Sequence, residues 1–412
     1  MMWGRAVSIV NAAGAAGAAG DAGDRGIGSL RFTSRIVAID APPKRGDTVI
    51  DAQGSWILPG LVNAHDHLEL NHYGRLKFRD RYENATEWIG DMRPRLGADA
   101  AIRRGQGHPL TERLFIGALK NLLAGVTTVA HHNPYYTELR RTMPIRVVRR
   151  YGWAHSFALS REPAGARGEP GGDVVQRWSR TSADAPFFVH IAEGVDEEAG
   201  RELSRLDALG CLTPNTVVIH GVAINAGGLR RIVDADAGLV WCPGSNMFLF
   251  GRTAAVRLLL DAARGRPCPV ALGSDSRLTG SNDLLDELRV ARDTRCASPF
   301  ELLEMVTTNP ARLLRLRRAG RLAVGDPADF IVVPRSDGDA AAALLAAARR
   351  DIELVVVGGR PLVASAPFVD VFRARSAVAR PLTVDGVSKL GESGLVRRIA
   401  GCPIVEPGVS AG

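Results

Sequence analysis

Two histidines one residue apart, His65 and His67, are the residues of this chain best suited to metal chemistry. They follow the apolar segment 56–62, which predicts a buried strand interrupted at Pro59 and Gly60. Because alternate residues of a strand point to the same side, both imidazoles can bind one divalent metal ion. A His-x-His pair is a weak indication alone, so its value depends on what other strand ends supply.

Three later apolar segments also end in side chains that bind metals or transfer protons. In chain order they end at His190 with Glu193 close behind it, at His220, and at Asp275. Fully buried parallel strands have this pattern. In a (β/α) barrel the C-terminal ends of the strands meet on one face, where active sites lie. The sequence therefore predicts one site built from four strand ends.

The elements that must position this site follow from the order of predicted strands and helices. The chain has 412 residues, enough for a barrel and a smaller accessory domain. We expect an α/β fold, a distorted (β/α)8 TIM barrel over residues 57–317. A small β-sandwich is expected from both chain termini, residues 1–56 and 318–376. Residues 377–412 show no clear periodicity and are predicted to be a C-terminal tail.

Seven barrel strands can be predicted, but the fourth cannot be located. The interval between the predicted strands at 153–159 and 187–191 is too short for an ordinary strand and helix. Residues 161–173 within it are rich in Gly and Pro, which indicates a loop. We therefore expect a fourth strand that is very short and irregular, or missing.

Charge and composition argue against several classes of protein. The net charge is +8, from 52 Lys and Arg against 44 Asp and Glu, and nearly all of the basic residues are arginine. The arginines of 146–150 and 312–318 alternate with apolar residues, which predicts solvent faces of amphipathic helices and no nucleic-acid surface. No apolar segment has membrane-spanning length, and the start lacks a signal-peptide pattern. We expect a soluble protein without nucleic-acid or membrane partners.

The five cysteines are scattered along the chain and contain no Cys-x-x-Cys pair. Neither a disulfide framework nor a thiolate zinc site is therefore predicted, and a cytoplasmic location is expected. Cys242 stands at a predicted strand end, where it is interpreted as a small buried filler rather than a nucleophile, because no motif activates it.

As an ordered set, these motifs resemble the amidohydrolase superfamily, on the branch that holds cytosine, adenosine and triazine-type deaminases. The resemblance spans about residues 50–335. Its motifs are LPGLVNAHDH (58–67), GVTTV (125–129), HIAE (190–193), VIHG (218–221), CPGSN (242–246), GSDS (273–276) and GDPAD (325–329).

The resemblance implies a role for each of six residues. The implied ligands of one catalytic metal ion are His65, His67, His190 and Asp275. Asp275 would also accept the proton of the attacking water. Glu193 would carry a proton to the leaving group or ring nitrogen. His220 would orient the water and stabilise the developing negative charge. A divalent ion lowers the pKa of its bound water toward about 7, which agrees with these roles.

Binuclear members of the family bridge two metal ions with a carbamylated lysine on the fourth strand. None of the lysines of this chain is expected at that place; they are Lys44, Lys77, Lys120 and Lys389. We therefore expect one divalent metal ion, Zn²⁺ or Fe²⁺, and composition does not choose between the two.

A small-molecule substrate is expected, with contacts near the mouth of the barrel. The candidate substrate-binding residues are Glu69, Asn71, Arg75, His132, His155, Ser245 and Asn246. Each also has a structural interpretation: Ser and Asn favour turns, for example, and a strand histidine can be a hydrogen-bonded core residue. Dimers are common in the resembled family, so a homodimer stays an open alternative.

The predicted activity is hydrolytic deamination of an amino-substituted nitrogen heterocycle by a metal-activated water. No Pro-Gln pair follows His67, which argues against guanine as the substrate. A second hypothesis keeps the site and changes the bond, to hydrolysis of a cyclic amide or N-acyl group or the reverse ring-closing dehydration. A third hypothesis is a non-catalytic binding protein whose barrel has lost its activity.

Overall fold

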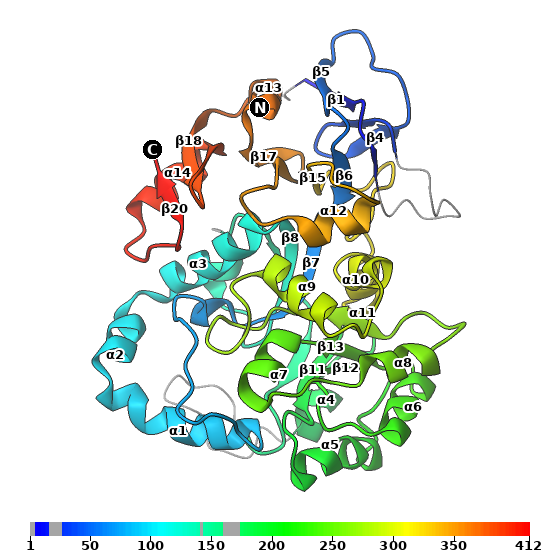
Figure 1. Cartoon of the computed structure of the whole chain (residues 1–412), viewed down its shortest axis with the longest axis vertical. Helices are drawn as coiled ribbons and strands as arrows, with labels where there is room; N and C mark the ends of the chain where they lie inside the picture. The colour runs from blue at the N-terminus through cyan, green and yellow to red at the C-terminus, as the bar shows by residue number, and fades with distance from the viewer. Residues whose placement is uncertain (1–4, 16–26, 141–142, 160–173) are drawn as a thin grey trace.

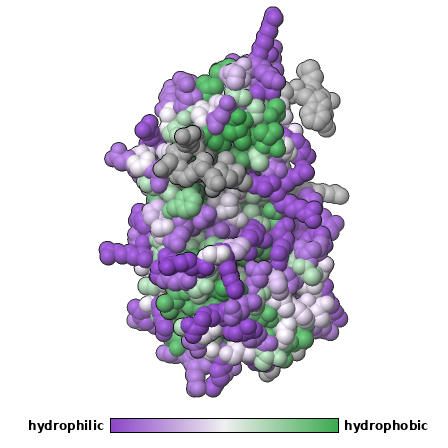
Figure 2. Space-filling view, turned by 90° about the vertical axis from the view of Figure 1, so that its right-hand side faces the viewer, coloured by the Kyte–Doolittle hydropathy of each residue, from purple (hydrophilic) through white to green (hydrophobic). Residues whose placement is uncertain are grey.

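The computed structural model describes residues 5–15, 27–140, 143–159 and 174–412. Figure 1 shows two bodies along the long axis, with β-strands near both chain ends in the upper body and an α/β body below. In the described part of the chain, no helix combines the length and apolar character needed to cross a bilayer. On the face shown in Figure 2, hydrophilic side chains cover most of the surface and hydrophobic ones gather in separate patches.

The lower body is a barrel-like α/β core in which the described residues form eight parallel strands in two sheets, and this confirms the predicted fold class. Nearly all of the strand residues are buried, as expected for parallel strands covered on both faces. One sheet consists of β7 (Leu61–Asp66), β8 (Val126–His131) and β9 (Arg146–Val147). The other consists of β10 (Gly152–Ala154), β11 (Phe187–Ile191), β12 (Thr216–His220), β13 (Gly238–Trp241) and β14 (Val270–Leu272).

The irregular strand is the third, not the fourth. β9 has two residues and pairs with β8, so β10 takes the fourth place. The prediction of a helix face at 146–150 was wrong, because Arg146 sits in this strand and its Nε lies 2.7 Å from Asp329 Oδ2. A strand of two residues has too little length to show a periodicity of its own. The predicted loop at 161–173 lies outside the described residues.

Helices cover the outside of the barrel between successive strands. They are α3 (Leu110–Leu123), α4 (Val174–Ser179), α5 (Glu197–Ala208), α6 (Ala226–Asp234), α8 (Val256–Ala262), α9 (Leu284–Asp293), α10 (Pro299–Met305) and α11 (Thr308–Leu313). Several begin at side-chain caps, such as Asp196, which accepts from Ala199 N at the start of α5. Two further helices, α1 (Ala85–Ala98) and α2 (Ala100–Gly107), lie on one flank of the barrel (Figure 1).

The upper body is the β-sandwich predicted from both chain ends. Its first sheet holds β1 (Val7–Val10), β3 (Leu30–Phe32), β4 (Ile36–Ile39) and β5 (Thr48–Asp51). Its second holds β2 (Gly14–Ala15), β6 (Trp56–Pro59), β15 (Phe330–Val333), β16 (Leu354–Val357), β17 (Arg360–Ala364), β18 (Ala379–Val384), β19 (Val387–Glu392) and β20 (Val409–Ala411). The two sheets share a core in which the rings of Phe32 and Phe330 lie 4.9 Å apart.

Residues 377–412, which the sequence analysis set apart as a tail, extend the second sheet. They supply β18, β19 and β20, and α14 (Ser393–Gly401) packs against these strands. Glu406 is buried and accepts two hydrogen bonds from Arg277, at 2.8 and 2.6 Å, just after the predicted ligand Asp275. The segment is therefore joined to the sandwich by backbone pairing and to the barrel by an ion pair. Neither kind of contact produces an apolar periodicity in the sequence.

Candidate metal centre and active site

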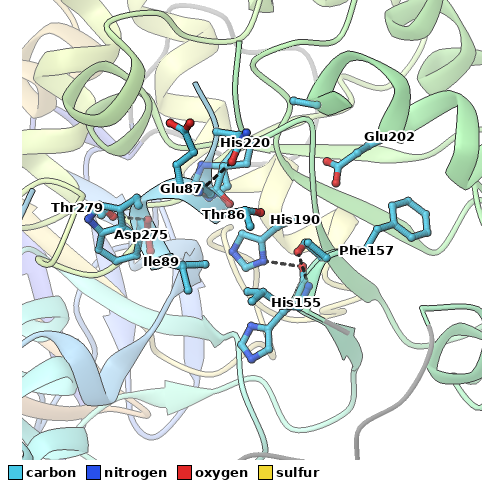
Figure 3. Close-up of a pocket in the computed structure, with 18 of the residues that line it drawn as sticks. Thr86, Glu87, Ile89, His155, Phe157, His190, Glu202, His220, Asp275 and Thr279 are labelled. Atoms are coloured by element: carbon cyan, nitrogen blue, oxygen red, sulfur yellow. Dashed lines mark hydrogen bonds and ion pairs between the residues drawn. The ribbon is translucent and has the colours of Figure 1, made fainter. Parts of the chain in front are cut away.

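A cavity of about 720 Å³ opens at the C-terminal ends of the barrel strands. Figure 3 shows His190, His220 and Asp275 grouped on one side of it, with Phe157 and Glu202 on the other. Strand ends of this kind converge in any parallel barrel, so residues far apart in the sequence become neighbours. The rest of the wall comes from α1, α5 and the segment 155–159.

The structure brings the four predicted metal ligands together. Nε2 of His65 and Nε2 of His67 each lie 3.8 Å from Asp275 Oδ1. One ligand atom from each of these three residues lies within 4.8 Å of the others, and the same holds for His65, His190 and His220. The His190 ring centre is 5.1 Å from that of His65. The arrangement offers imidazole nitrogens and a carboxylate in two groups that share His65.

Hydrogen bonds orient two of the histidines. Nδ1 of His190 lies 3.0 Å from the backbone oxygen of His155, and Nδ1 of His220 lies 2.8 Å from Asn246 Oδ1. Both partners are oxygens that only accept, so each Nδ1 donates and each Nε2 carries a lone pair when the ring is neutral.

The remaining ring nitrogens allow a test of the fit to a metal ion. Nε2 of His65, Nδ1 of His67 and Nε2 of His220 are buried and have no hydrogen-bond partner among the described residues. Buried polar atoms are nearly always paired, so a group of unpaired nitrogens beside a carboxylate calls for a ligand. Nitrogen and oxygen donors suit a divalent ion such as zinc or iron, and the residues present fit one.

Protonation supports the same interpretation. Burial, followed by the neighbouring imidazoles, holds the pKa of His65 and of His190 well below the usual range. These rings are therefore neutral and able to bind a metal. Burial raises the pKa of Asp275. The opposing effects of His67, His220 and the hydrogen bonds from Ser276 and Thr279 are together larger, so the net shift of the pKa is downward. Its carboxylate is ionised.

Glu193 has the opposite character. Burial raises its pKa well above the usual range, and the charges of Asp275 and Glu202 add to the effect. Its Oε1 lies 3.4 Å from Nε2 of His220, and its side chain keeps 18% exposure to the cavity. Two carboxyl groups with opposite pKa shifts therefore face one cavity, which is the arrangement that acid–base chemistry requires.

The backbone is strained at this site. Ala192, His220 and Asp275 have φ angles of +57°, +71° and +52°, in the left-handed region that residues other than glycine rarely adopt. All three stand at the ends of β11, β12 and β14 or just beyond. Strained residues of this kind persist where the surrounding structure holds them and often mark functional sites.

Ser245, Asn246 and His132 do not line the cavity, while His155 does. Asn246 holds His220, as described above. Ser245 donates to Thr279 Oγ1 at 2.9 Å, and Thr279 in turn donates to Asp275 Oδ2 at 2.9 Å. His132 is buried with Nε2 3.0 Å from the backbone oxygen of Ala154. Asn246 thus holds His220, and Ser245 holds Asp275 through Thr279, both from outside the cavity.

The other three predicted substrate contacts also lie outside the cavity lining. Glu69 is buried against His131, whose Nδ1 lies 3.7 Å from its Oε2. Asn71 is buried and donates to Asp66, and Arg75 Nε donates to the backbone oxygen of Gly280 at 2.7 Å. The loop after His67 turns into a short 3₁₀ helix, η1 (Leu68–Leu70), packed on α3, which draws these side chains away from the cavity.

Sequence reasoning missed the opposite wall. It includes apolar side chains and several acidic ones: Trp88, Ile89, Phe157 and Leu278, with Glu87, Glu198 and Glu202. The start of α1 had a detectable signal, because Asn84 accepts from Glu87 N as a helix cap. No local pattern indicates that this helix borders the cavity.

Comparisons with known proteins agree with this architecture. Residues 187–362 match the model of the Amidohydrolase family. A 5-methylthioadenosine/S-adenosylhomocysteine deaminase of Haloarcula marismortui is 28% identical over 343 residues, 72% of this chain and 77% of that protein. One of Nitratidesulfovibrio vulgaris is 25% identical, over 77% of this chain and 81% of its own length.

Two solved structures share the fold. An adenosine deaminase from Xanthomonas campestris with bound zinc superposes with a TM-score of 0.66 at 18% identity, covering 90% of this chain and 98% of the other. Atrazine chlorohydrolase from Arthrobacter aurescens complexed with zinc has a TM-score of 0.67 at 20% identity, with the same coverage.

Proposed function

We propose that this chain, in which residues 187–362 match the Amidohydrolase family model, is a metal-dependent hydrolase that deaminates an amino-substituted nitrogen heterocycle. The observation that supports this most directly is that candidate metal ligands and a candidate proton donor lie at one cavity. His65 forms one close group with His67 and Asp275 and a second with His190 and His220, and Glu193 with a raised pKa lies beside His220. The named relatives are deaminases of adenine nucleosides, which favours a substrate of that class.

We propose that His65, His67, His190 and Asp275 hold one divalent ion, Zn²⁺ or Fe²⁺. Such an ion acts as a Lewis acid, and it lowers the pKa of a bound water toward about 7. The carboxylate of Asp275, ionised by its lowered pKa, accepts the proton that the attacking water loses.

Glu193 and His220 supply the remaining proton transfers and hydrogen bonds. The raised pKa of Glu193 favours its protonated form, so that it can donate to the ring nitrogen beside the carbon under attack. His220, oriented by Asn246, directs its Nε2 toward Glu193 and the cavity. Transfer of a proton to the amino group then allows ammonia to leave.

The cavity suits a ligand of nucleoside size. Its volume of about 720 Å³ lies within the range of pockets for small molecules. Trp88, Ile89 and Phe157 offer apolar contacts for a ring or an alkyl substituent. Glu202 and Glu198 add acceptors on the same wall, which favours substrates that carry hydrogen-bond donors there.

The first test is metal content by elemental mass spectrometry, followed by a screen of aminated heterocycles for ammonia release. We expect about one zinc or iron per chain. Glu193→Gln should keep that metal and lose about 10²–10⁴-fold in kcat, because it removes the proton donor. Glu197→Gln, an exposed residue in the same region, is the matched control. Turnover without ammonia, with a new carboxylate instead, would replace deamination by amide hydrolysis, and near-zero metal would contradict the proposal.

A further inference from the structure

Three of the proposed ligands lie in β7 or just after β7 and β14, but these two strands do not form a ladder of paired residues. In the sheets of the described chain, β7 pairs with β8 and β14 pairs with β13. A backbone hydrogen bond from Asp275 N to the oxygen of His65, at 3.1 Å, joins the two strand ends. The seam between β7 and β14 is therefore one of two places, with the junction of β9 and β10, where neighbouring strands of the described barrel are not paired. Ligand spacing at the β7–β14 seam must still be exact to within a few tenths of an ångström.

The two strands approach each other closely at this seam. A Cβ atom added to Gly273 would lie 2.7 Å from Cβ of His65, far inside normal contact. Glycine is the residue that permits such an approach of two backbones. The two backbones are thus in direct contact at this seam, with no room for an intervening side chain.

Asp66 stands between the two ligands His65 and His67, and its side chain points to the other side of the strand. There Oδ1 accepts a hydrogen bond from Asn71 Nδ2 at 2.8 Å, and Oδ2 accepts one from Asn121 Nδ2 at 2.7 Å. Lys120 Nζ lies 3.2 Å from the same Oδ2, and both charged side chains are fully buried.

Lys120 reaches across the seam from α3. Its Nζ donates to the backbone oxygen of Asp275 at 3.1 Å and to Ser274 Oγ at 3.2 Å, and to Asn71 Oδ1 at 2.7 Å. Asn63 of β7 adds a second link to Ser274, at 2.8 Å from its Nδ2 to Oγ and at 3.1 Å from Ser274 N to its Oδ1. Surrounded by oxygens, the Lys120 ammonium is fully satisfied.

We propose that Lys120, with Asp66, is a positioning residue that ties β7 to β14 behind the cavity and thereby sets the spacing of His65, His67 and Asp275. This inference rests on the proposed metal site. Its geometric basis is that Lys120 Nζ donates to the backbone oxygen of Asp275 and lies 3.2 Å from the carboxylate of Asp66, the residue between the other two ligands. Replacement of a residue that holds a metal ligand in place commonly weakens metal affinity by about 10–100-fold, and we expect an effect of this size here.

A second buried lysine provides a matched control. Lys389 of β19 is 4% exposed, and its Nζ donates to the backbone oxygen of Ile352 at 2.9 Å and to Ser365 Oγ at 2.8 Å. It lies in the sandwich and touches none of the proposed ligands. Replacement of either lysine removes a buried ammonium, but only replacement of Lys120 breaks the link across the seam.

The test measures binding of Co²⁺ and Zn²⁺ by chelator competition, together with the visible absorption spectrum of bound Co²⁺, which reports ligand geometry. Asp66→Asn combined with Lys120→Met removes both charges, so that neither is left buried alone. We expect this variant to bind Co²⁺ about 10–100-fold more weakly with an altered spectrum. Lys389→Met should lose stability but keep wild-type metal affinity. Ser274→Ala, which strands no charge, should weaken binding to a smaller extent and decides the question should the double variant fail to fold.

The outcomes separate the inference from the function on which it rests. If the wild-type protein binds neither ion, the metal site and the proposed function both fail. If the wild-type protein binds Co²⁺ and the Lys120 or Ser274 variant that folds binds it equally well with the same spectrum, the inference alone is overturned. Equal weakening by Lys389→Met would also overturn it, because affinity would then follow general stability.

Discussion

The two sides of the cavity are held in different ways. On the strand side, His190, His220 and Asp275 are at most 8% exposed, stand on β11 and β12 or just after β14, and are held by hydrogen bonds. On the helix side, residues of α1 and α5 such as Thr86 and Glu198 are exposed and have few such supports. The difference indicates that the strand side carries the chemistry and the helix side the choice of substrate.

The largest effect should come from breaking the strand side itself. In His67→Ala we expect no measurable turnover and a loss of metal affinity beyond the roughly 100-fold that a change of outer partner causes. Metal content and ammonia release measure both effects. His108→Ala, which removes a histidine that does not line the cavity, should leave both unchanged. Retention of metal by His67→Ala would remove this residue from the ligand set.

The strand side also depends on the C-terminal segment. Glu406→Ala leaves Arg277 and Arg349 without a buried partner that lies 2.6 Å from each. We expect a loss of about 3–5 kcal/mol in the free energy of unfolding, measured by urea denaturation. Asp370→Ala, which breaks an exposed pair with Arg373, should cost at most about 1 kcal/mol. Equal effects would mean that the C-terminal segment does not anchor the barrel.

On the helix side, truncation should change binding more than chemistry. Ile89→Ala removes apolar surface that faces the cavity (Figure 3). We expect KM to rise about 5–30-fold with kcat nearly unchanged, because the lost contact contributes about 1–2 kcal/mol of binding. Leu96→Ala, at an exposed position of the same helix, is the control. A fall in kcat with KM unchanged would contradict the division between the two sides.

The smallest predicted effect concerns Glu202, whose Oε2 accepts from Ala192 N at 2.7 Å. Burial raises its pKa to about 7, so the unfolded chain loses this proton at lower pH than the folded protein does. The free energy of unfolding should therefore fall as pH rises toward 7, by at most about 1.4 kcal/mol per pH unit.

Glu202→Gln should remove this part of the pH dependence, and denaturation at several pH values measures it. Glu197→Gln, with a side chain 84% exposed, should keep the wild-type slope. An unchanged slope in Glu202→Gln would show that another group carries the dependence.

Much of the fold could be predicted because its signals are local. A buried parallel strand appears as an apolar run that ends in a polar residue, and this pattern located His65, His190, His220 and Asp275. The sandwich from both chain ends followed from short strands at each end. The two-residue β9 was missed because it is shorter than any detectable period.

The substrate contacts could not be predicted in the same way. Glu69, Asn71 and Arg75 stand in the expected loop, but the path of that loop turns them away from the cavity. For Lys120 the sequence indicates only that it is not on the fourth strand, because its partners lie 54 residues earlier at Asp66 and 155 residues later at Asp275. Contacts over such separations depend on how helices pack on the barrel.

The local sequence therefore determines which reactive side chains stand at strand ends, while the tertiary structure determines which of them act together. Residue type and strand periodicity determine which side chains reach the end of a strand, because alternation is a property of the backbone. Packing alone determines which strand ends meet, which carboxyl group gains a proton, and which lysine holds the seam. Burial and distance produce those effects, and neither is a property of a single segment of the chain.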